Sequence, residues 1–228
     1  MDPQLARLIA ACVTFVGSHF VLSHPLRQPV YNVIGERGFM GLYSLVALAS
    51  FGWMIVAFRA VPGGSPLWDG TGNTPWALAS ALTLFAAVLL VGSFQGNPAM
   101  PDPRARDLAR RGPHGVFHIT RHPMMWSFAL WATAHVAVAP TPRVLVLAGA
   151  LGVLALVGAH LQDRKKEVLM GAEWAQWETQ TSYWPRLSGL ARTGNLPRYG
   201  GLVLWLVATW GHIPLIYVPA GAWRWLVG

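Results

Sequence analysis

The chain has 228 residues, of which 54 % are hydrophobic and only 11 % are charged. Soluble domains carry about 25 % charged residues, so this composition argues against a water-soluble globule. The 24 Gly, 17 Pro and 12 Trp are spread among long apolar runs, as is typical of helical membrane bundles. The single cysteine, Cys12, has no partner in the chain, which excludes an intramolecular disulfide and a zinc–thiolate site.

Six nearly uncharged runs of 18 to 20 residues match the roughly 20 residues that a helix needs to cross a bilayer. We therefore predict an all-α fold: a polytopic membrane helix bundle of about six transmembrane helices, forming one integral-membrane domain over residues 1–228. The segment around Arg7 lacks the pattern of a cleaved signal peptide, so the first run is included. The predicted spans are Leu5–Leu22, Phe39–Phe58, Pro75–Phe94, Pro123–Pro140, Val144–Leu161 and Gly201–Ala220.

The positive charge is concentrated in alternate connections. Of the 17 Lys and Arg residues, 13 lie between spans one and two, three and four, and five and six. Cytoplasmic connections are enriched in these residues, so we predict a multi-pass inner-membrane protein with both termini outside the cytoplasm. The same distribution accounts for the net charge of +8 without nucleic acid, and membrane lipid is the expected partner.

Two stretches between the spans are predicted to lie outside the bilayer core. Residues 95–122 are rich in Pro, Gly and Arg without a helical period, which indicates a cytoplasmic loop that could fold back as a lid. Residues 162–183 place Met170, Trp174 and Trp177 at i, i+4 and i+7 among charged residues. This spacing predicts an amphipathic helix lying on the inner leaflet.

Histidines inside the predicted spans are the candidates for chemistry, because such side chains are costly in a membrane. His135 and His212 each lie about 17 Å from the cytoplasmic end of their spans, at 1.5 Å of rise per residue. His19 reaches a similar depth only if its helix continues to Gln28. Two imidazoles at one depth are typical of axial haem ligation. The alternative is that each histidine makes an interhelical hydrogen bond.

Three stretches resemble the NnrU family of membrane proteins. The first is ITRHP at residues 119–123, followed by Trp126, Phe128, Trp131, Ala134 and His135. The second combines GSHFVLSHPLR at residues 17–27 with GERGFMGLYSL at residues 35–45. The third is DRKKEVLMGAEWAQWETQTSYWP at residues 163–185. Together the resemblance covers most of the chain from Gly17 to Pro185.

That family includes the plant 15-cis-zeta-carotene isomerases, whose bundle carries a b-type haem between histidines of the first span and of the span after RHP. The resemblance therefore implies haem b held by His19 and His135, with a redox-dependent isomerase role. An apolar polyene substrate and an electron donor would be its partners. The isomerases have a Cys three residues before the second histidine. This chain has Ala132 there, so a ligand switch through that Cys is unavailable.

Three other functions remain open on the sequence alone. Bacterial relatives are associated with denitrification and nitric oxide metabolism, which suggests a membrane haem protein linked to those processes. The RHP motif also resembles the isoprenylcysteine carboxyl methyltransferases, which bind S-adenosylmethionine. Those enzymes carry a Tyr two residues after RHP and a later Glu pair, where this chain has Met125 and only Glu167. An assembly factor for another membrane complex would need no active site.

Arginines near the cytoplasmic helix ends are candidates for binding the haem propionates. Arg27, Arg121 and Arg164 come from the three motif stretches, and a guanidinium suits bidentate carboxylate binding. Because Pro123 begins a helix whose N-terminal end is positive, Arg121 beside it would form an anion site. We expect Arg121 to contact one propionate and Arg27 the other. The alternative is that these side chains reach lipid phosphates.

Overall fold

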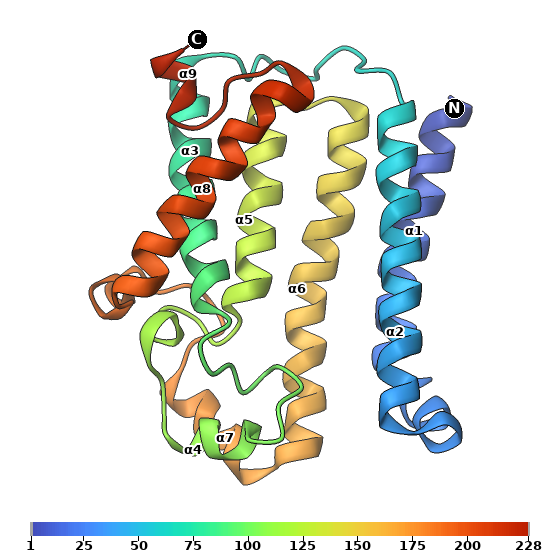
Figure 1. Ribbon diagram of the computed structural model, residues 1–228, viewed down its shortest axis with the longest axis vertical. Coiled ribbons are helices and arrows are strands. Elements are labelled where there is room, and N and C mark those ends of the chain that lie inside the picture. Colours follow the sequence, from blue (N-terminus) through green and yellow to red (C-terminus); the bar gives the residue numbers. More distant parts are fainter. Residues whose placement is uncertain (1, 228) are drawn as a thin grey trace.

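The computed structural model describes residues 2–227, and every regular element in that range is helical (Figure 1). The predicted all-α bundle is therefore confirmed. The α-helices are α1 (Pro3–Ser23), α2 (Arg27–Ala60), α3 (Asn73–Gly92), α4 (Ala105–Arg110), α5 (Pro123–Val138), α6 (Pro142–Met170), α7 (Ala172–Gln180), α8 (Asn195–Ile216) and α9 (Trp223–Leu226). Two short 3-10 helices, η1 (Gly115–His118) and η2 (Leu187–Arg192), complete the described elements.

Five helices are long and apolar enough to cross a membrane: α1, α2, α3, α6 and α8. The fourth predicted span, Pro123–Pro140, corresponds to α5, which has only 16 residues. It ends early because Pro140 and Pro142 lack the backbone N–H groups that a continuing helix would need. At 1.5 Å per residue α5 is about 24 Å long, shorter than a typical hydrocarbon core of about 30 Å.

The first helix does not continue to Gln28. It ends at Ser23, a turn follows, and α2 begins at Arg27. A kink then divides α2 at Gly35, whose φ of 71° lies in the left-handed region that favours glycine. The condition under which His19 would lie as deep as His135 is therefore not met. His19 is only four residues, or about 6 Å, from the end of its helix.

The helices form two groups joined by α6. In one group α3 packs against both α5 and α8, and in the other α1 packs against α2. Helix α6 contacts α5 on one side and α1 on the other, as Figure 1 shows. The two ends of the chain lie at one end of the bundle, and α4 and α7 lie at the other. This arrangement agrees with the prediction that the chain ends lie at the opposite end of the bundle from the connection after the third span.

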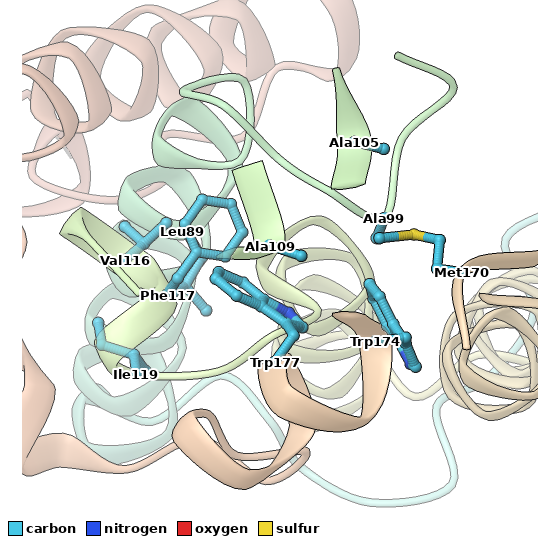
Figure 2. Packing of buried hydrophobic residues seen from close by; sticks show 10 residues of the cluster. All are labelled: Leu89, Ala99, Ala105, Ala109, Val116, Phe117, Ile119, Met170, Trp174 and Trp177. Atoms are coloured by element: carbon cyan, nitrogen blue, oxygen red, sulfur yellow. The ribbon is translucent and has the colours of Figure 1, made fainter. Parts of the chain in front are cut away.

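The connection after α3 folds back over one end of the bundle and encloses α7. Figure 2 shows its packing: Trp174 and Trp177 are fully buried against Phe117, Ala105 and Ala109. We call the layer formed by residues 95–122 and α7 the cap. Protein side chains, and not lipid, therefore cover the two indoles.

The prediction of one interfacial helix over 162–183 is wrong in two respects. First, α6 continues to Met170, and a turn at Gly171 (φ 61°) separates it from α7. Second, the apolar face that carries Trp174 and Trp177 packs inside the cap, because the folded-back loop covers it.

Truncating one of these indoles is expected to destabilise this end of the protein. Replacing Trp177 with Ala removes a fully buried side chain and should lower the free energy of unfolding by about 3–5 kcal/mol. Thermal melts followed by circular dichroism measure the effect. Trp184→Ala is the matched control, because Trp184 is 66 % exposed and its loss should change stability by about 0.5 kcal/mol or less. Equal effects would contradict the packing of Trp177 inside the cap.

Candidate functional site

A cavity of about 210 Å³ lies between α3, α5 and α8. Its walls are mainly apolar side chains, and two histidines from different helices face it, His135 from α5 and His212 from α8. Four hydroxyl side chains also line it, and among them the buried Ser80 Oγ has no hydrogen-bond partner within residues 2–227. An orphaned hydroxyl is costly in an apolar setting, so the cavity is suited to a ligand with a polar part.

The two cavity histidines are held in the same way. The Nδ1 atom of His135 donates to the carbonyl oxygen of Trp131 at 2.8 Å, and that of His212 donates to Ala208 at 2.9 Å. Because a carbonyl can only accept, Nδ1 carries the proton and the lone pair is left on Nε2. Metal-binding histidines are commonly oriented by such a second hydrogen bond. The ring centroids are 6.1 Å apart, with planes inclined by 31°.

The close approach of α8 depends on small residues. A Cβ at Gly201 would come within 2.7 Å of the Val88 backbone in α3, and one at Gly221 would meet Thr209 and the Trp205 ring at 2.8 Å. The indole Nε1 of Trp205 donates to Thr83 Oγ1 at 3.0 Å, which further joins α8 to α3. These contacts place His212 opposite His135.

The separation of the two cavity histidines is compatible with two imidazoles on one metal. Two such rings, each about 2 Å from the metal, place their centroids about 6 Å apart, and the observed distance is 6.1 Å. Within residues 2–227, groups of three or more His, Cys, Asp and Glu side chains do not converge on a metal position. A porphyrin supplies the remaining ligands of haem iron itself. The cavity is smaller than the roughly 300–1,000 Å³ of small-molecule sites, so a porphyrin would require the helices to separate.

His19 lies in a different interface. Its Nδ1 donates to the Phe15 carbonyl at 2.7 Å, and its ring lies 5.5 Å from that of Tyr43 in α2. Helix α1 packs against α2 and α6, whereas the His135 ring faces the α3–α5–α8 cavity. The structure thus brings His135 together with His212 and places His19 in the other helix group.

The RHP motif forms a buried ionic cluster with α6. Arg121 donates from Nε and Nη2 to the Asp163 carboxylate at 2.7–3.1 Å, and its Nη2 also lies 3.1 Å from Glu178. His122 contacts the same carboxylate through Nε2 at 2.8 Å. Arg121 therefore already has carboxylate partners from within the chain. A haem propionate or another anion would have to displace one of them.

Two other residues contact the ring nitrogens of His122. Gln162 donates from Nε2 to the Ala99 carbonyl at 3.1 Å, so its Oε1 faces the ring and lies 3.2 Å from His122 Nδ1. The other ring nitrogen, Nε2, lies 2.8 Å from the Asp163 carboxylate. Burial raises the pKa of Glu178, and the negative charge of Asp163 adds to that effect against the opposing charge of Arg121.

The other two arginines differ in their surroundings. Arg164 pairs with Glu167 at 3.1 Å on the exposed face of α6. Arg27 lies beside aromatic rings, with its guanidinium carbon 5.8 Å from the centre of Tyr31 and 6.0 Å from that of Phe39. Among the described residues, Arg27 has no carboxylate within 4.0 Å.

Sequence reasoning missed Asp163, Gln162 and Glu178 as partners of the RHP motif. A signal was present, since Asp163 is the first charged residue after the apolar run of α6 and its partners lie at the start of the preceding helix, α5. Antiparallel neighbouring helices bring such ends together. The lone Glu167, at the position where the methyltransferases carry a Glu pair, instead pairs with Arg164.

Among known proteins, the chain is similar to one family. The family model described as NnrU protein matches residues 7–220. No curated protein and no solved structure matches the chain significantly. The matched region includes the RHP motif and both cavity histidines. The chain therefore belongs to the NnrU family of multi-pass membrane proteins.

Proposed function

We propose that this protein is a haem b-binding redox protein of the membrane, with His135 and His212 as the axial ligands. The observation that carries the proposal is the pair of Nε2 lone pairs left free in one apolar cavity, since each Nδ1 is engaged by its own helix. Held by these two histidines, a haem would supply one-electron redox chemistry. An electron donor would then be a required partner.

The chain's own residues would bind, orient and shield the group. The carbonyls of Trp131 and Ala208 set the ring tautomers and raise the basicity of Nε2. The indole of Trp131 lies 3.9 Å from the His135 ring and restricts its rotation. The mainly apolar walls exclude water, which favours the less charged state of an electron-transfer site. The Ser80 hydroxyl would donate to any polar edge that enters.

The residue at the isomerase Cys position favours a nitric oxide or denitrification-linked role over action on a polyene. With Ala132 in place of the isomerase Cys, a thiolate cannot assist release of an axial ligand. We therefore rank the nitric oxide-linked role above isomerisation of a carotenoid, and both above methyl transfer.

The absorption spectrum of detergent-purified protein tests this proposal. We expect a Soret band and, after dithionite, a sharp α band of low-spin haem, with about one haem per chain by extraction. Nitric oxide should shift the spectrum of the reduced protein by displacing one of the two histidines. Incubation with 9,15,9'-tricis-zeta-carotene should leave the substrate unchanged. Protein that stays colourless after loading with haem, or that binds S-adenosylmethionine stoichiometrically, would contradict the proposal.

A further inference from the structure

Two cations and a histidine meet where α1, α2 and α6 come together, at the same end of the bundle as α4 and α7. His24 follows α1, Arg27 begins α2, and Lys165 lies in the last turns of α6. The Arg27 amide donates to the His24 carbonyl at 3.3 Å, and α1, which His24 follows, packs against both α2 and α6. The charge of Lys165 also contributes to lowering the pKa of His24, as expected for neighbouring groups. All three residues are partly buried. Two like charges and a titratable imidazole therefore share a partly desolvated position.

No carboxylate of residues 2–227 pairs with these cations. The ion pairs in the described range involve other basic side chains, and none includes His24, Arg27 or Lys165. The neighbouring Lys166 adds to the field, since its Nζ donates only to the carbonyls of Pro98 and Met100, at 2.7 and 3.1 Å. Uncompensated, partly buried cations are costly, so the position calls for an anion from outside the chain.

The surroundings of Arg27 suit the binding of such an anion. The guanidinium lies near Tyr31, before the kink at Gly35, and near Phe39, after it. The kink brings both rings to the same side chain. A guanidinium positioned in this way retains its donors for bidentate binding of a phosphate.

The surroundings indicate which anion binds. Apolar side chains are exposed around the same elbow, among them Val33, which is 83 % exposed. The others are Leu26, Ile34 and Met40. Exposed apolar side chains next to uncompensated cations suit a molecule with acyl chains and an anionic head. Basic pockets between transmembrane helices bind such headgroups in other proteins.

We propose that His24, Arg27 and Lys165 form a binding site for the phosphate of an anionic membrane lipid, at the elbow between α1 and α2. The site is separate from the two-histidine cavity, which lies in the other helix group. It would anchor the α1–α2 pair to α6 through the bound headgroup.

Lipid retention by the full-length protein tests this site. Protein exposed to phosphatidylcholine vesicles, with or without phosphatidylglycerol, is extracted and its bound lipid is measured by native mass spectrometry. The double variant Arg27→Gln/Lys165→Gln should bind phosphatidylglycerol at least about tenfold more weakly. Arg27→Lys should bind more weakly than the wild type and more tightly than the double variant, because it keeps the charge but loses the bidentate donors. The matched control is Arg111→Gln/Arg192→Gln, which removes two exposed cations and should bind as the wild type does.

Thermal stability distinguishes a bound lipid from a bound free phosphate. In uncharged detergent the melting temperature of Arg27→Gln/Lys165→Gln should equal or exceed that of the wild type, because a repulsion is removed. Only the wild type and the control should then gain stability from phosphatidylglycerol. Equal lipid binding by the double variant and the control would overturn the proposal. So would a stabilisation by inorganic phosphate as large as that by phosphatidylglycerol, or a loss of haem from Arg27→Gln.

The titration of His24 provides a readout without any variant. Burial and the charge of Lys165 lower the pKa of His24. A lipid phosphate in the site brings negative charge and favours the imidazolium, so NMR titration should show the pKa of His24 rising when phosphatidylglycerol is added. An unchanged pKa would overturn the proposal even if the double variant failed to fold.

Discussion

Replacing Asp163 with Asn is expected to lower the free energy of unfolding by about 3–5 kcal/mol, since it removes one partner of the buried Arg121–Asp163 ion pair. The Asp163 carboxylate contacts both Arg121 and His122, and Asp163 is 4 % exposed. An amide is uncharged, and its NH2 group would face the donors of Arg121. The remaining acid, Glu178, contacts only Arg121.

The destabilisation caused by Asp163→Asn should extend beyond the ionic cluster. His122 is the residue immediately before α5, and its backbone carbonyl accepts from Trp126 at 3.0 Å. The adjoining chain is fixed by contacts with residues 182–186, including Arg121 N to the Ser182 carbonyl at 2.8 Å. Disorder at this cluster would therefore loosen the start of α5 and the cap that packs over it. Proteolysis of the loop over residues 95–122 should become faster.

Two measurements check this expectation. Thermal melts by circular dichroism give the change in stability, and limited proteolysis reports on the loop. Glu167→Gln is the matched control, because it removes the carboxylate of the Arg164–Glu167 pair one helical turn further along α6. Surface pairs of this kind contribute about 0–1 kcal/mol. If both variants lost stability equally, the buried cluster would not be an essential element of the cap.

Residue spacing was enough to predict that His135 and His212 lie at one depth, whereas the pair predicted as ligands was His19 and His135. Counting residues along two spans placed His135 and His212 at one depth, and the structure brings their rings to 6.1 Å. The count worked because a helix rises regularly and both spans begin near the same end. The same count could not place His19. Its depth depended on whether the first helix continued beyond Ser23, and the sequence pattern did not decide this.

At Arg121 the sequence predicted the charged group but not its partners. The arginine, the proline and the helix start were all predicted, and an open anion site followed from them. The carboxylates that occupy the guanidinium come from Asp163 and Glu178, about 40 and 57 residues further along the chain, and only the fold brings them there. Local pattern therefore identified the charged group without its partners.

The amphipathic spacing of Met170, Trp174 and Trp177 also did not identify the contact partner. A stripe of apolar side chains at helical spacing shows that one face is buried, and it does not show whether lipid or protein covers that face. The covering layer is the loop that carries Phe117, whose composition had suggested only an irregular segment. A Pro- and Gly-rich stretch gives little periodic signal even when it is well packed.

The histidine variants should have the largest spectroscopic effect. We expect His135→Ala and His212→Ala each to lose the low-spin spectrum and to retain haem at least about tenfold more weakly, because each removes one axial nitrogen. His19→Ala should keep the spectrum, since His19 lies against Tyr43 in the other helix group. His160→Ala, on the exposed surface of α6, is the matched control.

Added imidazole distinguishes loss of a ligand from loss of the fold. In His212→Ala the missing side chain leaves room beside the cavity, so free imidazole should restore the low-spin bands if His212 is a ligand. If the histidines only bonded the carbonyls of their own helices, each alanine variant would leave any spectrum unchanged and would alter stability by about 1 kcal/mol. Loss of the spectrum in His19→Ala together with its retention in His212→Ala would instead support His19 and His135 as the ligand pair, and would require α1 to approach α5 when the haem binds.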